Sequence, residues 1–92
     1  MTPYLLEYYT SPTCLPCKTF LPLVKEQLKG LERQVTLEVI DVSKRPEAAF
    51  AAGVRTAPTL ILYANYSGGP KPLRQLNGAV PEEKLKSFLL LP

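Results

Sequence analysis

Two cysteines three positions apart, Cys14 and Cys17, stand where a short apolar run gives way to a helical pattern. The run 4–9 is aromatic and apolar on both faces, which is typical of a strand covered on both sides. From Leu15 to Lys29 apolar residues recur every three or four positions, which predicts an amphipathic helix that ends at Gly30. Both sulfurs must therefore lie at the start of one helix that follows a buried strand.

The spacing of the two cysteines has a chemical meaning at a helix start. If Cys14 caps the helix and Cys17 lies one turn inside it, the two side chains share a face and can form a disulfide. Cys14 then lies beside unpartnered backbone N–H groups at the positive end of the helix dipole, which favours its thiolate. Pro16 suits the first helical turn. Because Cys17 falls on the apolar stripe, we expect it to be shielded and Cys14 to be exposed.

The pair predicts a dithiol/disulfide redox site, and two other interpretations stay open. A zinc site usually needs four ligands, and this chain has no histidine and only these two cysteines. A purely structural bridge, or two inert thiols, is the other alternative, although so short a loop removes little entropy from the unfolded chain. Lys18 adds a positive charge nearby, and its ordinary role would be that of a solvated surface lysine.

Length and composition limit the function classes. The 92 residues fit one domain, 1–92, with a modest core. The net charge of +3 comes from interspersed charges, so no tract indicates nucleic-acid or membrane binding. No run approaches the roughly 20 apolar residues of a spanning helix, and no secretory signal is visible. We therefore expect a cytoplasmic protein, where a lone C-x-x-C pair favours catalysis, and we expect a monomer.

The remaining sequence alternates strand and helix patterns. In chain order we expect a strand at 35–42, a short helix at 48–52 that begins within 43–47, a strand at 59–63, a turn-like segment at 64–72, a strand at 73–76 and a last helix opened by 81–83. Strand, helix and strand in succession imply a parallel pair with a right-handed crossover. The last two strands predict a hairpin whose loop is longer than usual. The result is an α/β fold of order β-α-β-α-β-β-α, with a mixed four-stranded sheet flanked by helices.

This order, with Cys14-Leu15-Pro16-Cys17 at the first strand-to-helix turn, resembles the thioredoxin family. The resemblance covers nearly the whole chain, in a compact form that lacks the extra N-terminal strand and helix of full-length thioredoxins. The other matching features are Pro22 within the first helix, the segment 53–60, Gly78 and the closing segment 85–89. The resemblance implies a thioredoxin-like fold and a thiol–disulfide oxidoreductase.

The resemblance also implies a substrate contact. Pro58 corresponds to the family's cis-proline, which packs beside the disulfide. The residue before it, Ala57, would offer its backbone N–H and C=O to an extended substrate segment as a short strand pairing. Together with Thr13, Leu15 and Pro16 around the first cysteine, these residues form the substrate site that the resemblance implies.

Two positions depart from the family pattern. Thr13 stands where thioredoxins usually carry a tryptophan. The position of their buried aspartate falls on Tyr8, so the proton acceptor for the second cysteine is either missing or supplied by Glu7 after a shift in register. Otherwise Glu7 lies near the strand end and reaches water. The segment 9–14 is more similar to glutaredoxins, but the sequence after Gly78 lacks their glutathione-binding arrangement, so glutathione binding is not expected.

The leading hypothesis is a thiol–disulfide oxidoreductase that reduces protein disulfides. Cys14 attacks the substrate, and Cys17 then releases the reduced product and leaves both cysteines oxidised. No bound cofactor or metal is expected, and electrons would come from a thioredoxin-reductase-type donor or a small thiol. The alternatives are a glutaredoxin-like electron donor dedicated to one client enzyme, and a thioredoxin-fold binding module whose cysteines do not cycle.

Overall fold

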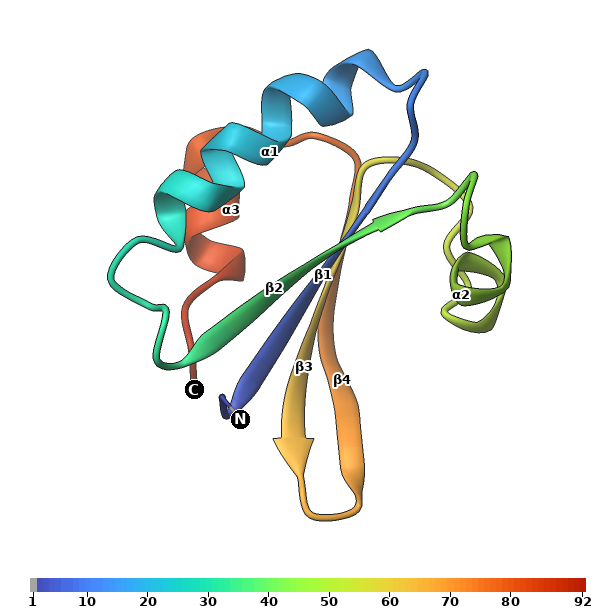
Figure 1. Cartoon of the computed structure of the whole chain (residues 1–92). Coiled ribbons are helices and arrows are strands. Elements are labelled where there is room, and N and C mark those ends of the chain that lie inside the picture. The colour runs from blue at the N-terminus through green and yellow to red at the C-terminus, as the bar shows by residue number, and fades with distance from the viewer. Residues whose placement is uncertain (1) are drawn as a thin grey trace.

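The computed structural model describes residues 2–92. Its elements, in chain order, are β1 (Tyr4–Thr10), α1 (Leu15–Gln27), β2 (Val35–Asp41), α2 (Pro46–Ala51), β3 (Thr59–Tyr66), β4 (Gly69–Asn77) and α3 (Glu82–Phe88). The strands form one sheet in the order β2-β1-β3-β4 (Figure 1). β1 pairs in parallel with β2, and the other two pairings are antiparallel. The predicted class, element order and mixed sheet are confirmed.

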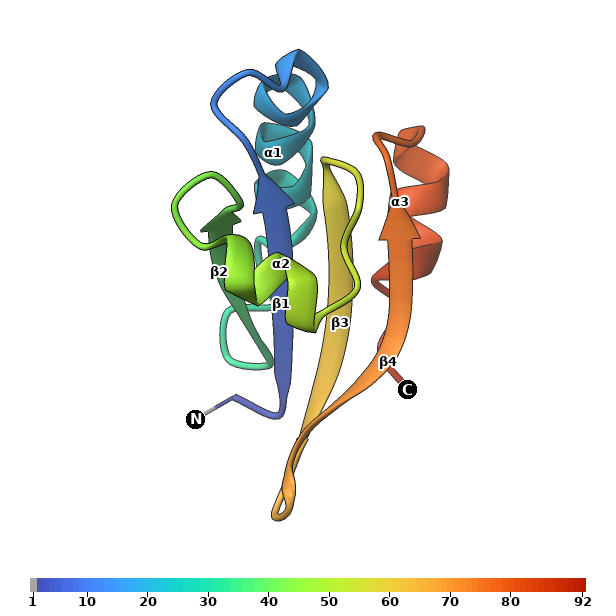
Figure 2. The same cartoon turned by 90° about the vertical axis from the view of Figure 1, so that its right-hand side faces the viewer.

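Helices cover both faces of the sheet, with α1 and α3 on one face and α2 on the other, as Figures 1 and 2 show. Side chains of β1 alternate between these faces: Leu6 and Tyr8 point toward α1 and α3, and Tyr9 points toward α2. The larger cluster also contains Phe20, Val24, Leu60, Leu62, Leu85, Phe88 and Leu89, and the smaller one contains Ile40, Ala49 and Ile61. This two-sided burial explains why the run 4–9 is apolar on both faces.

Helix α1 begins at the cysteine motif and runs past a proline. Cys14 is its N-cap, and the buried side chains of Cys17, Phe20 and Val24 form its inward stripe. Pro22 is exposed and lies within the helix, which continues through it to Gln27. The helix ends two residues earlier than predicted, and Gly30 follows with a φ of 86°, a conformation that favours glycine. Both termini lie at the end of the sheet opposite the β1–α1 turn (Figure 1).

The prediction of a long hairpin loop at 64–72 is wrong. Strand β3 continues to Tyr66 and β4 begins at Gly69, so only two residues separate the strands. Proline is tolerated on an edge strand because its missing N–H can face solvent, and β4 is such an edge at Pro70 and Pro72. A shift in register between Leu62 and Tyr63 takes up one extra residue of β4. Gly69, Pro70 and Pro72 therefore lie in a strand, although their local preference is for a loop.

One side chain of β4 ties the sheet to the end of α3. The guanidinium of Arg74 donates through Nη1 to the carbonyl oxygens of Phe88, at 2.7 Å, and Leu90, at 2.6 Å. Carbonyls at a helix C-terminus lack intrahelical partners, so this cation satisfies two acceptors that would otherwise need water. The last helix is thereby fixed against the sheet on the face that also carries α1.

Arg74→Gln is expected to lower the free energy of unfolding by about 1–3 kcal/mol, because hydrogen bonds from a charged donor contribute on that scale. Urea unfolding followed by circular dichroism measures the change. Lys71→Gln removes an exposed cation from the same strand and should change the free energy of unfolding by less than about 0.5 kcal/mol. Equal losses in the two variants would show that the contacts of Arg74 contribute nothing to stability.

Candidate active site

The two cysteines form a disulfide at the start of α1, with Cα atoms 5.3 Å apart. Cys14 is the N-cap, and its Sγ accepts a hydrogen bond from the backbone N–H of Cys17 at 3.1 Å. The N–H of Cys14 itself donates to the carbonyl of Ser11 at 3.2 Å, which closes the turn between β1 and α1. The predicted arrangement, with the first sulfur at the helix start and the second one turn inside, is confirmed.

The two sulfurs differ in their access to solvent. Cys17 is 1% exposed, whereas Cys14 is only half-buried. Thr13, Leu15 and Pro16, which flank Cys14 in the chain, are exposed. The neighbouring Lys18 is also exposed. The disulfide thus presents one sulfur outward and one inward, although Cys14 is less exposed than the sequence predicts.

Tyr8 lies beneath the second cysteine. Its hydroxyl donates to the carbonyl oxygen of Cys17 at 2.8 Å, and the residue is fully buried. Its ring packs against Phe20 with centroids 6.3 Å apart. Burial raises the pKa of Tyr8 to about 12, so the hydroxyl stays neutral and acts as a donor at physiological pH. The alternation of β1 predicts that Tyr8 lies on the face that carries α1, but no sequence pattern predicts the hydrogen bond of its hydroxyl.

Glu7 lies in the middle of β1 rather than near its end, on the face opposite to Tyr8. It is half-buried and accepts a hydrogen bond from the hydroxyl of Tyr9 at 2.7 Å. Burial is the largest cause that raises the pKa of Tyr9, and the nearby Glu7 carboxylate raises it further. The same two causes raise the pKa of Tyr63 to about 12. The strand has no shift in register that would turn Glu7 toward Cys17. The alternative in which Glu7 serves the second cysteine is therefore wrong.

The loop before β3 also reaches the site. The Ala57–Pro58 peptide bond is cis, as the resemblance implies. The N–H of Gly78 donates to the carbonyl of Pro58 at 2.7 Å, and the hydroxyl of Thr59 donates to the carbonyl of Thr56 at 2.7 Å, so both flanks of the loop are held. Ala57 packs against the same core cluster as the two cysteines. Within residues 2–92 its backbone N–H and C=O have no backbone partner.

A groove of about 330 Å³ opens beside this loop. Its lining residues are Ser11, Val42, Pro46, Ala49, Val54, Arg55, Thr56 and Ala57. Two of its lining residues lie near the cysteine motif in the chain or in the loop described above: Ser11 accepts the N–H of Cys14 through its carbonyl, and Ala57 precedes the cis-proline. Sequence reasoning missed it because its walls come from four segments that only the fold brings together.

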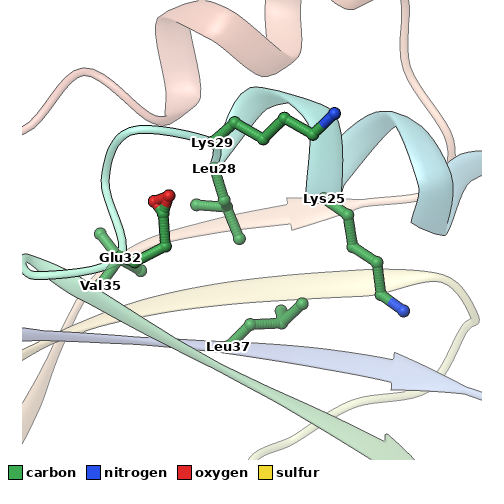
Figure 3. Close-up of a pocket in the computed structure, with 6 residues that line it drawn as sticks. All are labelled: Lys25, Leu28, Lys29, Glu32, Val35 and Leu37. Atoms are coloured by element: carbon green, nitrogen blue, oxygen red, sulfur yellow. The ribbon is translucent and has the colours of Figure 1, made fainter.

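A second groove lies at the opposite end of α1, as Figure 3 shows. It is lined by Lys25, Leu28, Lys29, Glu32, Val35 and Leu37. The Glu32 carboxylate accepts the N–H of Gly30 through both oxygens, at 2.7 and 2.8 Å, which lowers the pKa of that carboxyl. Glu32 thus closes the turn after α1, and this groove is remote from the cysteines.

Residues 2–92, which the structure describes, hold neither a metal-binding cluster nor a membrane-spanning helix. No three His, Cys, Asp or Glu side chains gather there as a metal ion would need. None of the helices in the same range is long and apolar enough to cross a bilayer.

Comparisons with known proteins agree with this geometry. The thioredoxin family model matches residues 1–90. The chain is 31% identical to a thioredoxin of Alicyclobacillus acidocaldarius subsp. acidocaldarius over 95% of its own length and 78% of that protein. It is also 29% identical, over 92% of its length, to a segment that makes up 15% of the NADPH-dependent thioredoxin reductase 3 of Arabidopsis thaliana.

Solved structures show the same fold. The germline-specific thioredoxin Deadhead of Drosophila melanogaster superposes with a TM-score of 0.82 at 24% identity, over 94% of this chain and 77% of that one. The family match, the sheet order and a cysteine pair joined at the start of α1 all agree. The chain therefore belongs to the thioredoxin family and is a thiol–disulfide oxidoreductase.

Proposed function

We propose that this protein reduces disulfides in other proteins, with Cys14 as the attacking residue and Cys17 as the resolving residue. The observation that carries this assignment is the asymmetry of the pair. Cys14 is half-buried and its Sγ accepts a backbone N–H, whereas Cys17 is 1% exposed. A hydrogen bond and a helix start both favour the thiolate, which is the attacking form of the sulfur.

The exchange proceeds in two balanced steps. The Cys14 thiolate attacks one sulfur of the substrate disulfide, which breaks that bond, forms a mixed disulfide and releases the first substrate sulfur as a thiolate. Cys17 then loses its proton to solvent and attacks Cys14 Sγ, which breaks the mixed disulfide and releases the second substrate thiolate. Two electrons pass to the substrate, and the Cys14–Cys17 disulfide forms.

The substrate lies along the loop at Ala57 in this proposal. An extended segment pairs with the free N–H and C=O of Ala57, while Pro58 packs behind it and Thr13, Leu15 and Pro16 contact it around the attacked sulfur. Two observations support this placement. The backbone groups of Ala57 have no backbone partner within residues 2–92, and the 330 Å³ groove beside them can take a substrate side chain.

The partners follow from the same chemistry. Disulfide-containing proteins are the substrates, and a thioredoxin-reductase-type donor or a small thiol returns the disulfide to the dithiol. The family match supports this choice of donor, as does the thioredoxin-like segment within a relative that is named as a thioredoxin reductase. A single dedicated client, the cytoplasmic location and the monomeric state stay predictions.

Catalysed reduction of a protein disulfide tests the proposal. The wild-type protein, at micromolar concentration with millimolar dithiothreitol, is expected to accelerate reduction well above dithiothreitol alone. The control is the same protein after reduction and alkylation of both thiols, which should be inert. Equal rates with active and alkylated protein on several unrelated substrates would contradict the general function, whereas acceleration on one client alone would identify a dedicated donor.

A further inference from the structure

The buried side of the disulfide carries no carboxylate. Among residues 2–92, no Asp or Glu is buried. The two half-buried acids are both engaged elsewhere: Glu7 accepts from Tyr9 on the opposite face of the sheet, and Asp41 accepts from the N–H and the hydroxyl of Ser43. The polar group that lies next to Cys17 inside the protein is the hydroxyl of Tyr8.

That hydroxyl is linked to the attacking sulfur through one residue. Tyr8 donates to the carbonyl of Cys17 at 2.8 Å, and the N–H of the same cysteine donates to Cys14 Sγ at 3.1 Å. The Tyr8 ring is fully buried between the sheet and α1, so its position is fixed by packing against Phe20. A rigid donor on β1 therefore holds the first turn of α1 at the residue that hydrogen-bonds Cys14.

We propose that Tyr8 is a positioning residue for thiol–disulfide exchange: its hydroxyl fixes the backbone of Cys17, so that the Cys17 N–H stays directed at Cys14 Sγ and stabilises the Cys14 thiolate. The proposal rests on the assigned role of Cys14 as the attacking sulfur. A neutral hydroxyl performs this task without adding a charge to the core, where an unpaired carboxylate would be costly.

The charged and titratable groups around the pair are few. On α1, Lys18 follows Cys17 and is exposed, and Arg55 lies exposed in the loop before Ala57. The core side chains that β3, α3 and the C-cap of α3 contribute to this cluster are apolar, namely Leu60, Leu62, Leu85, Phe88 and Leu89. Among these groups only Tyr8 is hydrogen-bonded to a cysteine. Removal of its hydroxyl leaves every nearby charge unchanged, so a change in Cys14 titration must come from geometry.

Tyr8→Phe tests the proposal, because it removes the hydroxyl and keeps the ring. In the reduced protein, the pH dependence of Cys14 alkylation by iodoacetamide gives the pKa of its thiol. We expect Tyr8→Phe to raise that pKa by about 1 unit, which is roughly a tenfold smaller thiolate fraction well below the pKa. Mass spectrometry of the peptide that contains Cys14 identifies the alkylated sulfur.

Tyr9→Phe is the matched control. Tyr9 is the next residue of β1 and is 2% exposed, but its hydroxyl donates to Glu7 on the opposite face. In this variant the pKa of the Cys14 thiol should stay within about 0.2 of the wild-type value, since the hydroxyl is removed from the other side of the sheet. An unchanged titration in Tyr8→Phe, or equal shifts in the two variants, would overturn the proposal.

A measurement on the wild-type protein covers the case in which Tyr8→Phe does not fold. The hydroxyl proton of a buried, hydrogen-bonded tyrosine is observable by NMR, and for Tyr8 its chemical shift should change at the pH where Cys14 ionises. A Tyr8 hydroxyl chemical shift that stays constant while Cys14 ionises would contradict the proposal. Both experiments use no disulfide substrate, so their outcome is independent of whether the protein reduces protein disulfides.

Discussion

Cys17→Ser is expected to stop turnover after one exchange and to leave a mixed disulfide on Cys14. The half-exposed Cys14 still attacks a substrate disulfide, but a serine hydroxyl cannot displace the bound sulfur. Turnover should fall by at least about a thousandfold, because the resolving step loses its positioned intramolecular nucleophile. Non-reducing electrophoresis and mass spectrometry should detect one substrate molecule per protein, released by dithiothreitol.

Cys14→Ser is the reciprocal variant. The remaining sulfur, on Cys17, is 1% exposed and lies behind the helix start, so it cannot reach a substrate disulfide. We expect neither turnover nor an adduct. An adduct in Cys14→Ser and none in Cys17→Ser would reverse the assigned roles. Applied to a cell extract, the Cys17→Ser variant would retain its clients as mixed disulfides and so identify them.

Leu62→Ala is expected to lower the free energy of unfolding by about 2–5 kcal/mol, the usual cost of a cavity left by a buried leucine. Leu62 is fully buried on β3, between β1 and β4 and in the cluster under α1 and α3. A small domain has a total stability of about 5–15 kcal/mol, so this loss is a large part of it. Urea unfolding monitored by circular dichroism measures the loss.

Leu73→Ala provides the comparison within the same hairpin. Leu73 is 37% exposed on the edge strand β4, where the register shifts, so its truncation leaves no closed cavity. Its effect should stay below about 1 kcal/mol, since little apolar area is lost from the interior. Similar losses in both variants would mean that the cluster under α1 and α3 does not dominate the stability of the sheet.

Local chemistry made much of the site predictable. Of two cysteines spaced in this way, the one that caps the helix can accept a backbone N–H, and the one on the apolar stripe of the helix is shielded. The sequence therefore predicted the different environments of Cys14 and Cys17 correctly. The apolar run 4–9 likewise predicted a central strand, because burial on both faces leaves no polar alternation.

The parts that sequence reasoning missed depend on tertiary contacts. Pro70 and Pro72 indicate a loop by local preference, but at the edge of a sheet their missing N–H groups cost little. The groove beside Ala57 and the hydrogen bond of Tyr8 join segments that are distant in the chain. No local pattern predicts contacts between such distant segments. The alternative role of Glu7 fails for a local reason instead, because the regular alternation along β1 places Glu7 on the face opposite to Tyr8.

The two borders of the sheet differ in what they can recruit. The β4 border carries Pro70 and Pro72, which have no backbone N–H to donate, and Lys71 lies between them. A strand of another molecule therefore finds few partners there for extending the sheet. The β2 border, Val35–Asp41, contains no proline. Intermolecular strand growth in a crowded solution would thus be favoured at the β2 border, where added charges would protect the protein from aggregation.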